Sequence, residues 1–393
     1  MKNLKQKEIG IYVHIPFCKR KCNYCDFCSY ENKENFIPEY IKYLLQEIQE
    51  VGEANQKDAE SNLDDLFLVK TIYIGGGTPS FIDSSYIVQI LETIQQYYKV
   101  DNQAEITIEV NPGTVNIEKL GDYKKAGVNR LSIGLQSTHE HLLKTIGRIH
   151  GYYDFLDTYR FAREAGFQNI NVDLMIGLPD QTILEVEDSL DEIISLEPEH
   201  VSVYSLIVEE NTKLQKQIED GTLKLPEEEL ERNMYWKVKE KLEQNDYIHY
   251  EISNFAKEKH ESKHNMDCWN QKEYIGFGVA AHSYTNGVRY SNVETIEEYI
   301  HNFKIGKQED NFVFHEKQTI TAKQKEYMLL GLRKIQGVSI QEFKNKFVEN
   351  PIYLYHTELE KLVNEDLLEI DGDWIKLTKK GLDLANLVWE EFV

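Results

Sequence analysis

The chain has 393 residues, with 67 acidic against 44 basic side chains, a net charge of −23 and 41% hydrophobic residues. The length indicates two or three domains, and the apolar content excludes a largely disordered chain. The acidic balance argues against a nucleic-acid partner, because binding phosphates requires a basic face. No apolar run reaches the roughly 20 residues of a membrane-spanning helix. The charged segment Met1–Glu8 lacks the apolar core of a signal peptide. We therefore expect a cytoplasmic protein with reduced cysteines.

Four of the five cysteines lie in one segment near the start of the chain: Cys18, Cys22, Cys25 and Cys28. The first three have the spacing C-x3-C-x2-C, and an apolar run ending at Ile15 leads directly into them. In a reducing compartment such a cluster predicts metal or cofactor ligands. Three thiolates can bind three irons of a [4Fe–4S] cluster and leave the fourth iron open. A structural zinc site made by all four cysteines is the alternative, although such sites usually draw on two separated pairs.

Short β-rich runs alternate with helical patterns over the first half of the chain. We expect a helix at 36–51, an exposed loop at 52–65, further helices after each strand, and strands around Ile11 and at 69–74, 106–110, 131–135, 170–176 and 201–206. This alternation predicts parallel βαβ units. Six strands are fewer than the eight of a closed barrel, which leaves an incomplete barrel or an open doubly wound sheet. In both folds, ligands bind at the C-terminal ends of the strands.

The pattern changes after Glu209, and we expect three domains over 1–210, 211–315 and 316–393. In the second, the sequence predicts a helix at 227–242, a strand at 249–255 and a Gly- and aromatic-rich segment at 264–284. In the third, it predicts helices at 322–334, 340–347, 355–365 and 382–388, with a hairpin at 367–377 around an Asp-Gly turn. This order resembles a winged-helix domain. Because the region is acidic, we expect it to be structural rather than DNA-binding.

Four motifs follow one another at or near strand ends: YVHIPFC at 12–18, GGGTP at 75–79, GLQS at 134–137 and DLMIGLP at 173–179. Together they resemble the radical S-adenosylmethionine (SAM) superfamily, and more narrowly the coproporphyrinogen dehydrogenases and their sister family, the HemW-type haem chaperones. The resemblance runs essentially end to end. It implies an incomplete (β/α)6 TIM-type barrel, a C-terminal α+β extension and a winged-helix-like domain. It also implies an open iron that chelates SAM, and an electron from the cluster that cleaves SAM to a 5′-deoxyadenosyl radical.

The resemblance also assigns site residues by motif. It makes Cys18, Cys22 and Cys25 the cluster ligands. It places SAM against Tyr12, Gly76, Gly77, Thr78, Glu109, Gln136, Arg148 and Asp173. For single residues other roles stay open: either carboxylate could pair with Arg130, and Arg148 could be a surface charge. We interpret Cys28 as a spare thiol, with an alternative ligand or a redox-sensitive group as the other possibilities.

Three features favour the chaperones over the dehydrogenases. This chain begins only about ten residues before its first strand. The dehydrogenases, which it otherwise resembles, carry an N-terminal extension. The dehydrogenases end their cluster loop with C-x3-C-x2-C-x-C. In this chain the last cysteine of that pattern is replaced by Phe27, in the segment Cys25-Asp-Phe-Cys28. The segment His264-Asn-Met-Asp-Cys268-Trp269 resembles the HNxxYW motif that is implicated in haem binding in the chaperones. Cys268 replaces the expected Tyr, and both His and Cys thiolate are competent haem ligands, so His264, Cys268 or neither could contact the iron.

The main hypothesis is a haem chaperone that carries a [4Fe–4S] cluster and SAM and delivers haem to client haemoproteins. The alternative is an oxygen-independent coproporphyrinogen III oxidase that forms protoporphyrinogen IX by radical decarboxylation. A third class, a zinc-stapled scaffold, predicts zinc and no iron–sulfur absorbance. The family resemblance leaves open clients at the membrane surface, a homodimer, and whether SAM cleavage is required.

Overall fold

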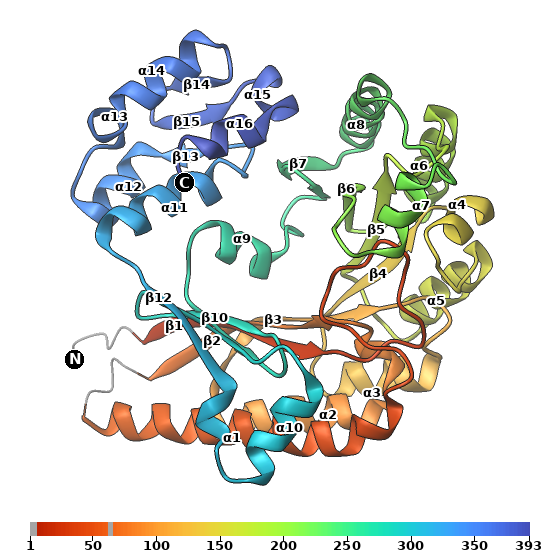
Figure 1. Ribbon diagram of the computed structural model, residues 1–393, viewed down its shortest axis with the longest axis vertical. Coiled ribbons are helices and arrows are strands. Elements are labelled where there is room, and N and C mark those ends of the chain that lie inside the picture. Colours follow the sequence, from red (N-terminus) through yellow and green to blue (C-terminus); the bar gives the residue numbers. More distant parts are fainter. Residues whose placement is uncertain (1–5, 62–65) are drawn as a thin grey trace.

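Six parallel strands form the centre of the fold in the computed structural model, which describes residues 6–61 and 66–393. These strands are β1 (Lys7–Ile15), β2 (Phe67–Gly76), β3 (Lys99–Val110), β4 (Arg130–Gln136), β5 (Ile170–Ile176) and β6 (His200–Ser205). They are neighbours in sequence order, so each crossover adds its strand to the same edge. A doubly wound sheet would reverse direction at a switch point. The fold is therefore the incomplete barrel, and Figure 1 shows its strands following an open arc.

Helices cover the outer face of this arc (Figure 1). They are α1 (Ile37–Ser61), α2 (Ser84–Tyr97), α3 (Ile117–Lys125), α4 (Glu140–Thr145), α5 (Tyr152–Glu164) and α6 (Ile183–Ser195). In α2, Ile87, Ile90, Leu91 and Ile94 recur at helical spacing and are fully buried in the main core. This is the apolar stripe that attaches an amphipathic helix to a sheet. The carboxylate of Asp83 accepts a bond from the Ser85 amide and so caps the helix start.

The prediction of a loop at 52–65 is wrong for residues 52–61, because α1 continues to Ser61. Residues 62–65 lie outside the described residues. The segment is polar but rich in Glu, Ala, Gln and Lys, which are good helix formers. Contacts with neighbouring elements also fix this end of α1. The Phe67 amide donates to Asn55 Oδ1 at 3.3 Å, and Gln56 Nε2 donates to the Tyr97 carbonyl at 2.8 Å.

The extension adds strands to both edges of the barrel sheet, giving a sheet of twelve strands among the described residues. Its elements are α7 (Lys213–Glu219), α8 (Glu228–Glu243), β7 (Ile248–Glu251), β8 (Asn254–Ala256), α9 (Lys263–Trp269), β9 (Tyr274–Phe277), β10 (His282–Thr285), β11 (Val288–Asn292), α10 (Ile296–Lys304) and β12 (Phe312–Lys317). Strand β8 pairs antiparallel with β6, and β9 pairs parallel with β1. The single strand expected at 249–255 is wrong, because the chain turns at Ile252–Ser253 into the β7–β8 hairpin.

The C-terminal region has its own apolar core and a three-stranded sheet in the order β13-β15-β14. Its elements are α11 (Ile320–Gly331), β13 (Val338–Ser339), α12 (Ile340–Phe347), α13 (Pro351–Leu354), α14 (His356–Asn364), β14 (Leu368–Asp371), β15 (Trp374–Leu377), α15 (Lys379–Asp383) and α16 (Ala385–Glu390). Helices and a hairpin in this order match the expected winged-helix arrangement. The closing helix expected at 382–388 is instead two short helices that meet at Leu384. The exact domain boundaries remain predictions.

Helix α9 lies between the barrel and the C-terminal region (Figure 1). The Arg333 guanidinium lies 4.4 Å from the ring centroid of Trp269 and 4.9 Å from that of Trp389, which links α9 to α16. Lys334 Nζ donates to Asn270 Oδ1 at 2.6 Å. These contacts fix the segment after His264 against the C-terminal region.

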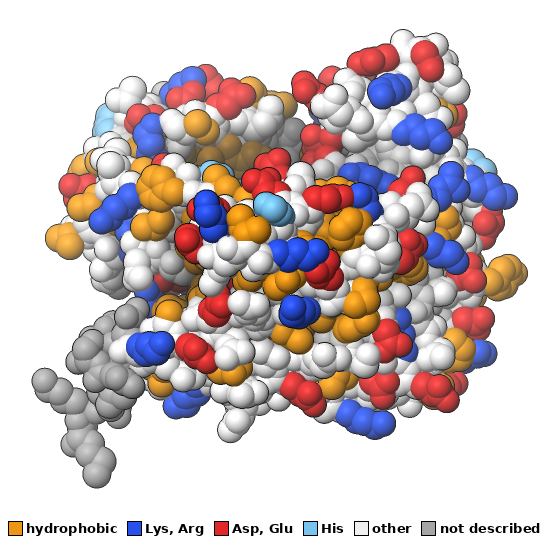
Figure 2. Space-filling view, turned by 60° about the horizontal axis from the view of Figure 1, so that its bottom comes forward, with side chains coloured by type: hydrophobic (Ala, Val, Ile, Leu, Met, Phe, Trp, Pro, Cys, Tyr) orange, Lys and Arg blue, Asp and Glu red, His pale blue; other side chains and the backbone are white. Residues whose placement is uncertain are grey.

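On the face shown in Figure 2, acidic and basic side chains are interspersed. In the described part of the chain, no helix combines the length and the apolar character needed to cross a bilayer.

Candidate functional site

The three cysteines of the C-x3-C-x2-C motif line a cavity of 350 Å³ at the C-terminal ends of the strands. The structure brings ten of the predicted site residues to its wall: Cys18, Cys22, Cys25, Gly76, Gly77, Thr78, Glu109, Gln136, Arg148 and Asp173. They come from the cysteine loop, from the ends of β2 to β5 and from the segment after α4. Two predicted residues, Tyr12 and His264, do not line this cavity.

Each of the three thiols lies near a polar side chain. Thr78 Oγ1 donates to Cys18 Sγ at 3.4 Å, and Arg148 Nη1 donates to Cys22 Sγ at 3.4 Å. Cys25 Sγ lies 3.8 Å from a serine hydroxyl oxygen, that of Ser29. Burial raises the pKa of the Cys18 and Cys25 thiols. Positive and hydrogen-bonding neighbours favour thiolates, which are the form that binds metal.

Cys28 points away from this cavity. Its Sγ lies 3.2 Å from the Glu294 carbonyl oxygen and 3.6 Å from the Tyr30 hydroxyl. The fourth cysteine of the segment therefore sits against the loop before α10, apart from the other three.

Two glycines of the GGGTP motif allow the backbone of β2 to approach the cysteine loop. A Cβ on Gly77 would lie 3.0 Å from Cys18 Sγ and equally close to the Phe17 carbonyl oxygen. Gly76 has a φ of +112°, and a Cβ there would lie 2.6 Å from the His14 ring. A side chain at Gly77 would displace the cysteine loop and one at Gly76 would displace the His14 ring, so steric contact requires both glycines.

Two half-buried carboxylates, Glu109 of β3 and Asp173 of β5, face the cavity. Glu109 accepts bonds from the Tyr73 hydroxyl at 2.9 Å and from the Gly76 amide at 3.1 Å. Burial raises the pKa of Glu109 to about 7, and burial also raises the pKa of Asp173. Among the described residues, neither carboxylate lies within ion-pair distance of Arg130, although the Arg130 charge opposes the burial that raises the pKa of Asp173. Arg130 therefore acts on Asp173 through its charge and not through a direct ion pair.

Arg148 is half-buried and not a surface charge. Its Nη2 atom donates to the Gly134 carbonyl oxygen at 2.5 Å and to Asn111 Oδ1 at 3.2 Å. The same side chain reaches Cys22 with its other terminal nitrogen. Arg148 therefore places a fixed positive charge between the strand ends and the cysteine loop.

The sequence of this chain matches known protein families and individual relatives. Residues 12–193 match the radical SAM superfamily, and residues 321–384 match the HemN C-terminal domain. The heme chaperone HemW of Bacillus subtilis (strain 168) is 39% identical over 385 residues, which cover 97% of this chain and 98% of that protein. The chain belongs to the HemW family. HemW of Lactococcus lactis (strain IL1403) is 36% identical over 99% of this chain and 98% of its own length.

The fold of this HemW-family chain also matches a solved structure. Coproporphyrinogen III oxidase (HemN) from Escherichia coli, a radical SAM enzyme, superposes with a TM-score of 0.84 over 100% of this chain and 91% of its own chain. At 21% sequence identity, this likeness shows the shared radical SAM fold.

Membership of the HemW family and the radical SAM superfamily implies a [4Fe–4S] cluster and SAM, and the cavity fits both groups. Three thiols from one loop line the same cavity, and three thiolates can hold three irons of such a cluster. The volume and the polar strand ends suit a small charged ligand.

Several residues of this HemW-family site were missed by sequence reasoning. The cavity wall also contains Tyr24, Tyr73, Asn111 and Tyr204. His14 lies behind the wall. Its Nε2 is 2.7 Å from the Cys28 carbonyl oxygen, and its Nδ1 is 2.9 Å from the Tyr12 hydroxyl. Tyr12 therefore supports the cysteine loop through His14. The alternation of β1 places Tyr12 and His14 on one face, and this signal could have identified His14.

His264 lies in α9, away from the cysteine cavity. Its ring is buried, packs at 5.3 Å on Tyr73, and has Nδ1 2.9 Å from Thr71 Oγ1. Burial lowers its pKa to about 4, so the imidazole is neutral at neutral pH. The pKa of Cys268 is raised to about 12, first by burial and then by Asp267. In the absence of a metal its thiol therefore stays protonated, whereas the neutral imidazole of His264 is already in the form that binds iron.

The Glu109→Gln variant is expected to lose part of the pH dependence of stability. The folded protein holds this proton more tightly than the unfolded chain, because burial raises the pKa from 4.5 to about 7. Stability therefore falls as the pH rises from about 4.5 to 7, by about 3 kcal/mol for this group. In denaturant titrations, the free energy of unfolding of the variant relative to that of the wild type should rise by about that amount between pH 5 and pH 8. A gain below about 1 kcal/mol would contradict the shift. Glu47→Gln removes a second carboxyl whose pKa burial raises to about 7, on α1 and outside the cavity, and should show a similar pH-dependent gain.

Proposed function

We propose that this protein is a haem chaperone, which binds haem and delivers it to client haemoproteins in the cytoplasm. Its curated relatives of nearly equal length are named heme chaperones. In this proposal Cys18, Cys22 and Cys25 hold a [4Fe–4S] cluster. SAM contacts the backbone of Gly76 and Gly77 and the side chains of Thr78, Glu109, Gln136, Arg148 and Asp173. When bound, the cluster supplies the electron for reductive SAM cleavage.

The observation that carries the haem proposal is a second cavity, beside α9. It has a volume of 840 Å³ and lies between the barrel, the β7 strand and the C-terminal region. Met266 and Asp267 of α9 line it, and so does Thr71, the hydrogen-bond partner of His264. The volume is within the range of about 300–1,000 Å³ typical of cofactor sites. His264 lies directly behind this wall, so coordination would need its ring to turn toward the cavity.

The wall of this second cavity is both apolar and basic. It includes Ile248, Ile335 and Trp374, and six lysines against two acidic residues: Lys70, Lys259, Lys263, Lys272, Lys334 and Lys376 against Glu261 and Asp267. Four of these lysines already pair with carboxylates: Lys70 with Asp101, Lys259 with Glu258, Lys272 with Asp267 and Lys376 with Asp371. Among the described residues this leaves Lys263 and Lys334 without an ion-pair partner. Haem is a flat apolar ring with two carboxylates, so it needs apolar walls and cations at one edge.

Lys334 is the cation best placed to receive a carboxylate. Its side chain is buried, and burial lowers its pKa. It donates to the Asn270 amide oxygen, and among the described residues no carboxylate lies within ion-pair distance of it. A buried ammonium group without an anion is costly, so an incoming propionate would be stabilised there.

The experiment that tests the function combines haem binding with an enzyme assay. After anaerobic reconstitution with iron and sulfide, we expect the wild type to bind haem and to transfer it to an apo-haemoprotein. Incubation with SAM, a reductant and coproporphyrinogen III should yield no protoporphyrinogen. Protoporphyrinogen formation would instead identify an oxygen-independent coproporphyrinogen oxidase.

Within this test, Lys334→Met should weaken haem binding about tenfold, which corresponds to ~1.4 kcal/mol. Lys304→Met makes the same change in net charge on α10, where Lys304 pairs with Glu39 at 2.9 Å, and should leave haem affinity unchanged. Equal affinities for the two variants would remove Lys334 from the site.

A further inference from the structure

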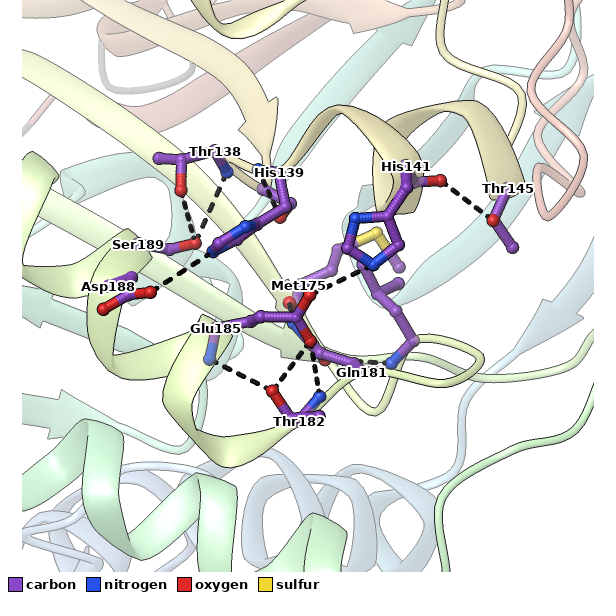
Figure 3. Close-up of polar contacts among 12 residues, drawn as sticks. Thr138, His139, His141, Thr145, Met175, Gln181, Thr182, Glu185, Asp188 and Ser189 are labelled. Atoms are coloured by element: carbon purple, nitrogen blue, oxygen red, sulfur yellow. Dashed lines mark hydrogen bonds and ion pairs between the residues drawn. The ribbon is translucent and has the colours of Figure 1, made fainter.

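A cluster of metal-ligating side chains lies outside both cavities, where the start of α4 meets the first turns of α6. His139 is the N-cap residue of α4 and His141 lies in its first turn, whereas Glu185 and Asp188 come from α6 (Figure 3). One ligand atom from each of His139, His141 and Glu185 lies within 4.8 Å of the other two. Figure 3 shows both imidazole rings directed toward the carboxylates of α6.

The distances in this cluster are close to those of an occupied metal site. His141 Nε2 lies 3.0 Å from Glu185 Oε1, and His139 Nε2 lies 4.0 Å from Asp188 Oδ2. Two ligands of a tetrahedral zinc, each about 2.0–2.1 Å from the ion, are roughly 3.3 Å apart. The separation between His141 and Glu185 therefore already matches that of two ligands of one ion.

Two further observations point to a missing ligand. The Nε2 atom of His139 is shielded from solvent and has no hydrogen-bond partner in the structure. Glu185 is held in place by the α6 capping box, in which Oε2 accepts bonds from the Thr182 amide and hydroxyl, both at 2.8 Å. This leaves Oε1 directed at the histidines. A carboxylate fixed by outer hydrogen bonds is a common feature of metal sites.

We propose that His139, His141 and Glu185 bind a divalent metal ion of the zinc class. Two imidazoles and one carboxylate form a borderline donor set that suits Zn²⁺ with a water in the fourth position. The ion would join the start of α4 to α6. The far end of α4 contacts the cysteine loop, because the Ile146 carbonyl accepts a bond from the Asn23 amide at 2.9 Å. Metal binding would therefore stabilise the segment that supports Cys22.

The test uses the protein that carries its iron–sulfur cluster. Calorimetry measures the binding of added zinc, and thermal unfolding measures its effect on stability. We expect the wild type to bind one more equivalent of Zn²⁺ than the His139→Ala/His141→Ala double variant, and to gain thermal stability from it. His356→Ala is the matched control, because His356 faces Glu360 at 3.8 Å on an exposed face of α14 without a second histidine. It should bind zinc like the wild type.

Equal stoichiometry and equal affinity in the wild type and the double variant would overturn the proposal. If the double variant fails to fold, His141→Ala alone gives the answer. That side chain is 60% exposed, so its loss removes a ligand without opening the core. In this variant we expect zinc affinity at the site to fall at least tenfold, and an unchanged affinity would refute the assignment.

Discussion

Replacing Cys22 with serine is expected to abolish iron–sulfur cluster formation. Cys22 lines the cavity with Cys18 and Cys25, and its sulfur accepts a charge-assisted hydrogen bond from Arg148. A [4Fe–4S] cluster held by three thiolates loses one of its few anchors when a serine hydroxyl replaces a thiolate. After anaerobic reconstitution, the wild type should contain about four irons per chain and show thiolate-to-iron absorbance. The variant should show neither.

Cys28→Ser is the matched control for this experiment. Cys28 lies on the same loop, but its thiol contacts the Glu294 carbonyl and Tyr30 and does not line the cavity. Iron content and visible absorbance should therefore equal those of the wild type. Loss of iron in both variants would show that the ligands are wrongly assigned. Retention of iron in both would mean that Cys28 replaces a missing ligand.

The cysteine site was predictable because its signals are local in the sequence. The spacing of Cys18, Cys22 and Cys25 is fixed within eight residues, and GGGTP marks a close backbone approach that only glycine permits. Parallel strands place their C-terminal ends at one edge, so Glu109 and Asp173 could be assigned to the same edge from strand order alone.

Other features depend on contacts that the sequence does not display. The extension of α1 to Ser61 depends on two hydrogen bonds with neighbouring elements: Asn55 accepts one from the Phe67 amide, and Gln56 donates one to the Tyr97 carbonyl. Tyr73 reaches Glu109 because β2 and β3 pair in a particular register, and no motif marks that register. The basic cavity beside α9 combines lysines from four separate parts of the chain. Only the packing of the C-terminal region against the barrel brings these residues together.

His264→Ala is expected to lower haem affinity at least about tenfold, or ~1.4 kcal/mol. His264 has the properties of a metal-binding histidine before any metal arrives. It is neutral at neutral pH, and its Nδ1 is paired with Thr71 Oγ1, so the ring must turn away from Thr71 and toward the second cavity before a ring nitrogen can reach the iron. Cys268 is one turn away, but its thiol has a pKa of about 12 and remains protonated. Cys268→Ser should therefore bind haem like the wild type.

Haem titrations followed by absorbance spectroscopy separate these outcomes. In His264→Ala the haem absorbance band should shift, because the iron loses its nitrogen ligand. Added imidazole should restore both the band position and the haem affinity, because it can occupy the space of the missing ring. Rescue by imidazole distinguishes a lost ligand from a damaged fold, because a general loss of packing would not recover. Haem binding that is unchanged in His264→Ala but lost in Cys268→Ser would reverse the assignment. The iron ligand would then be a thiolate, despite the burial that disfavours its charge.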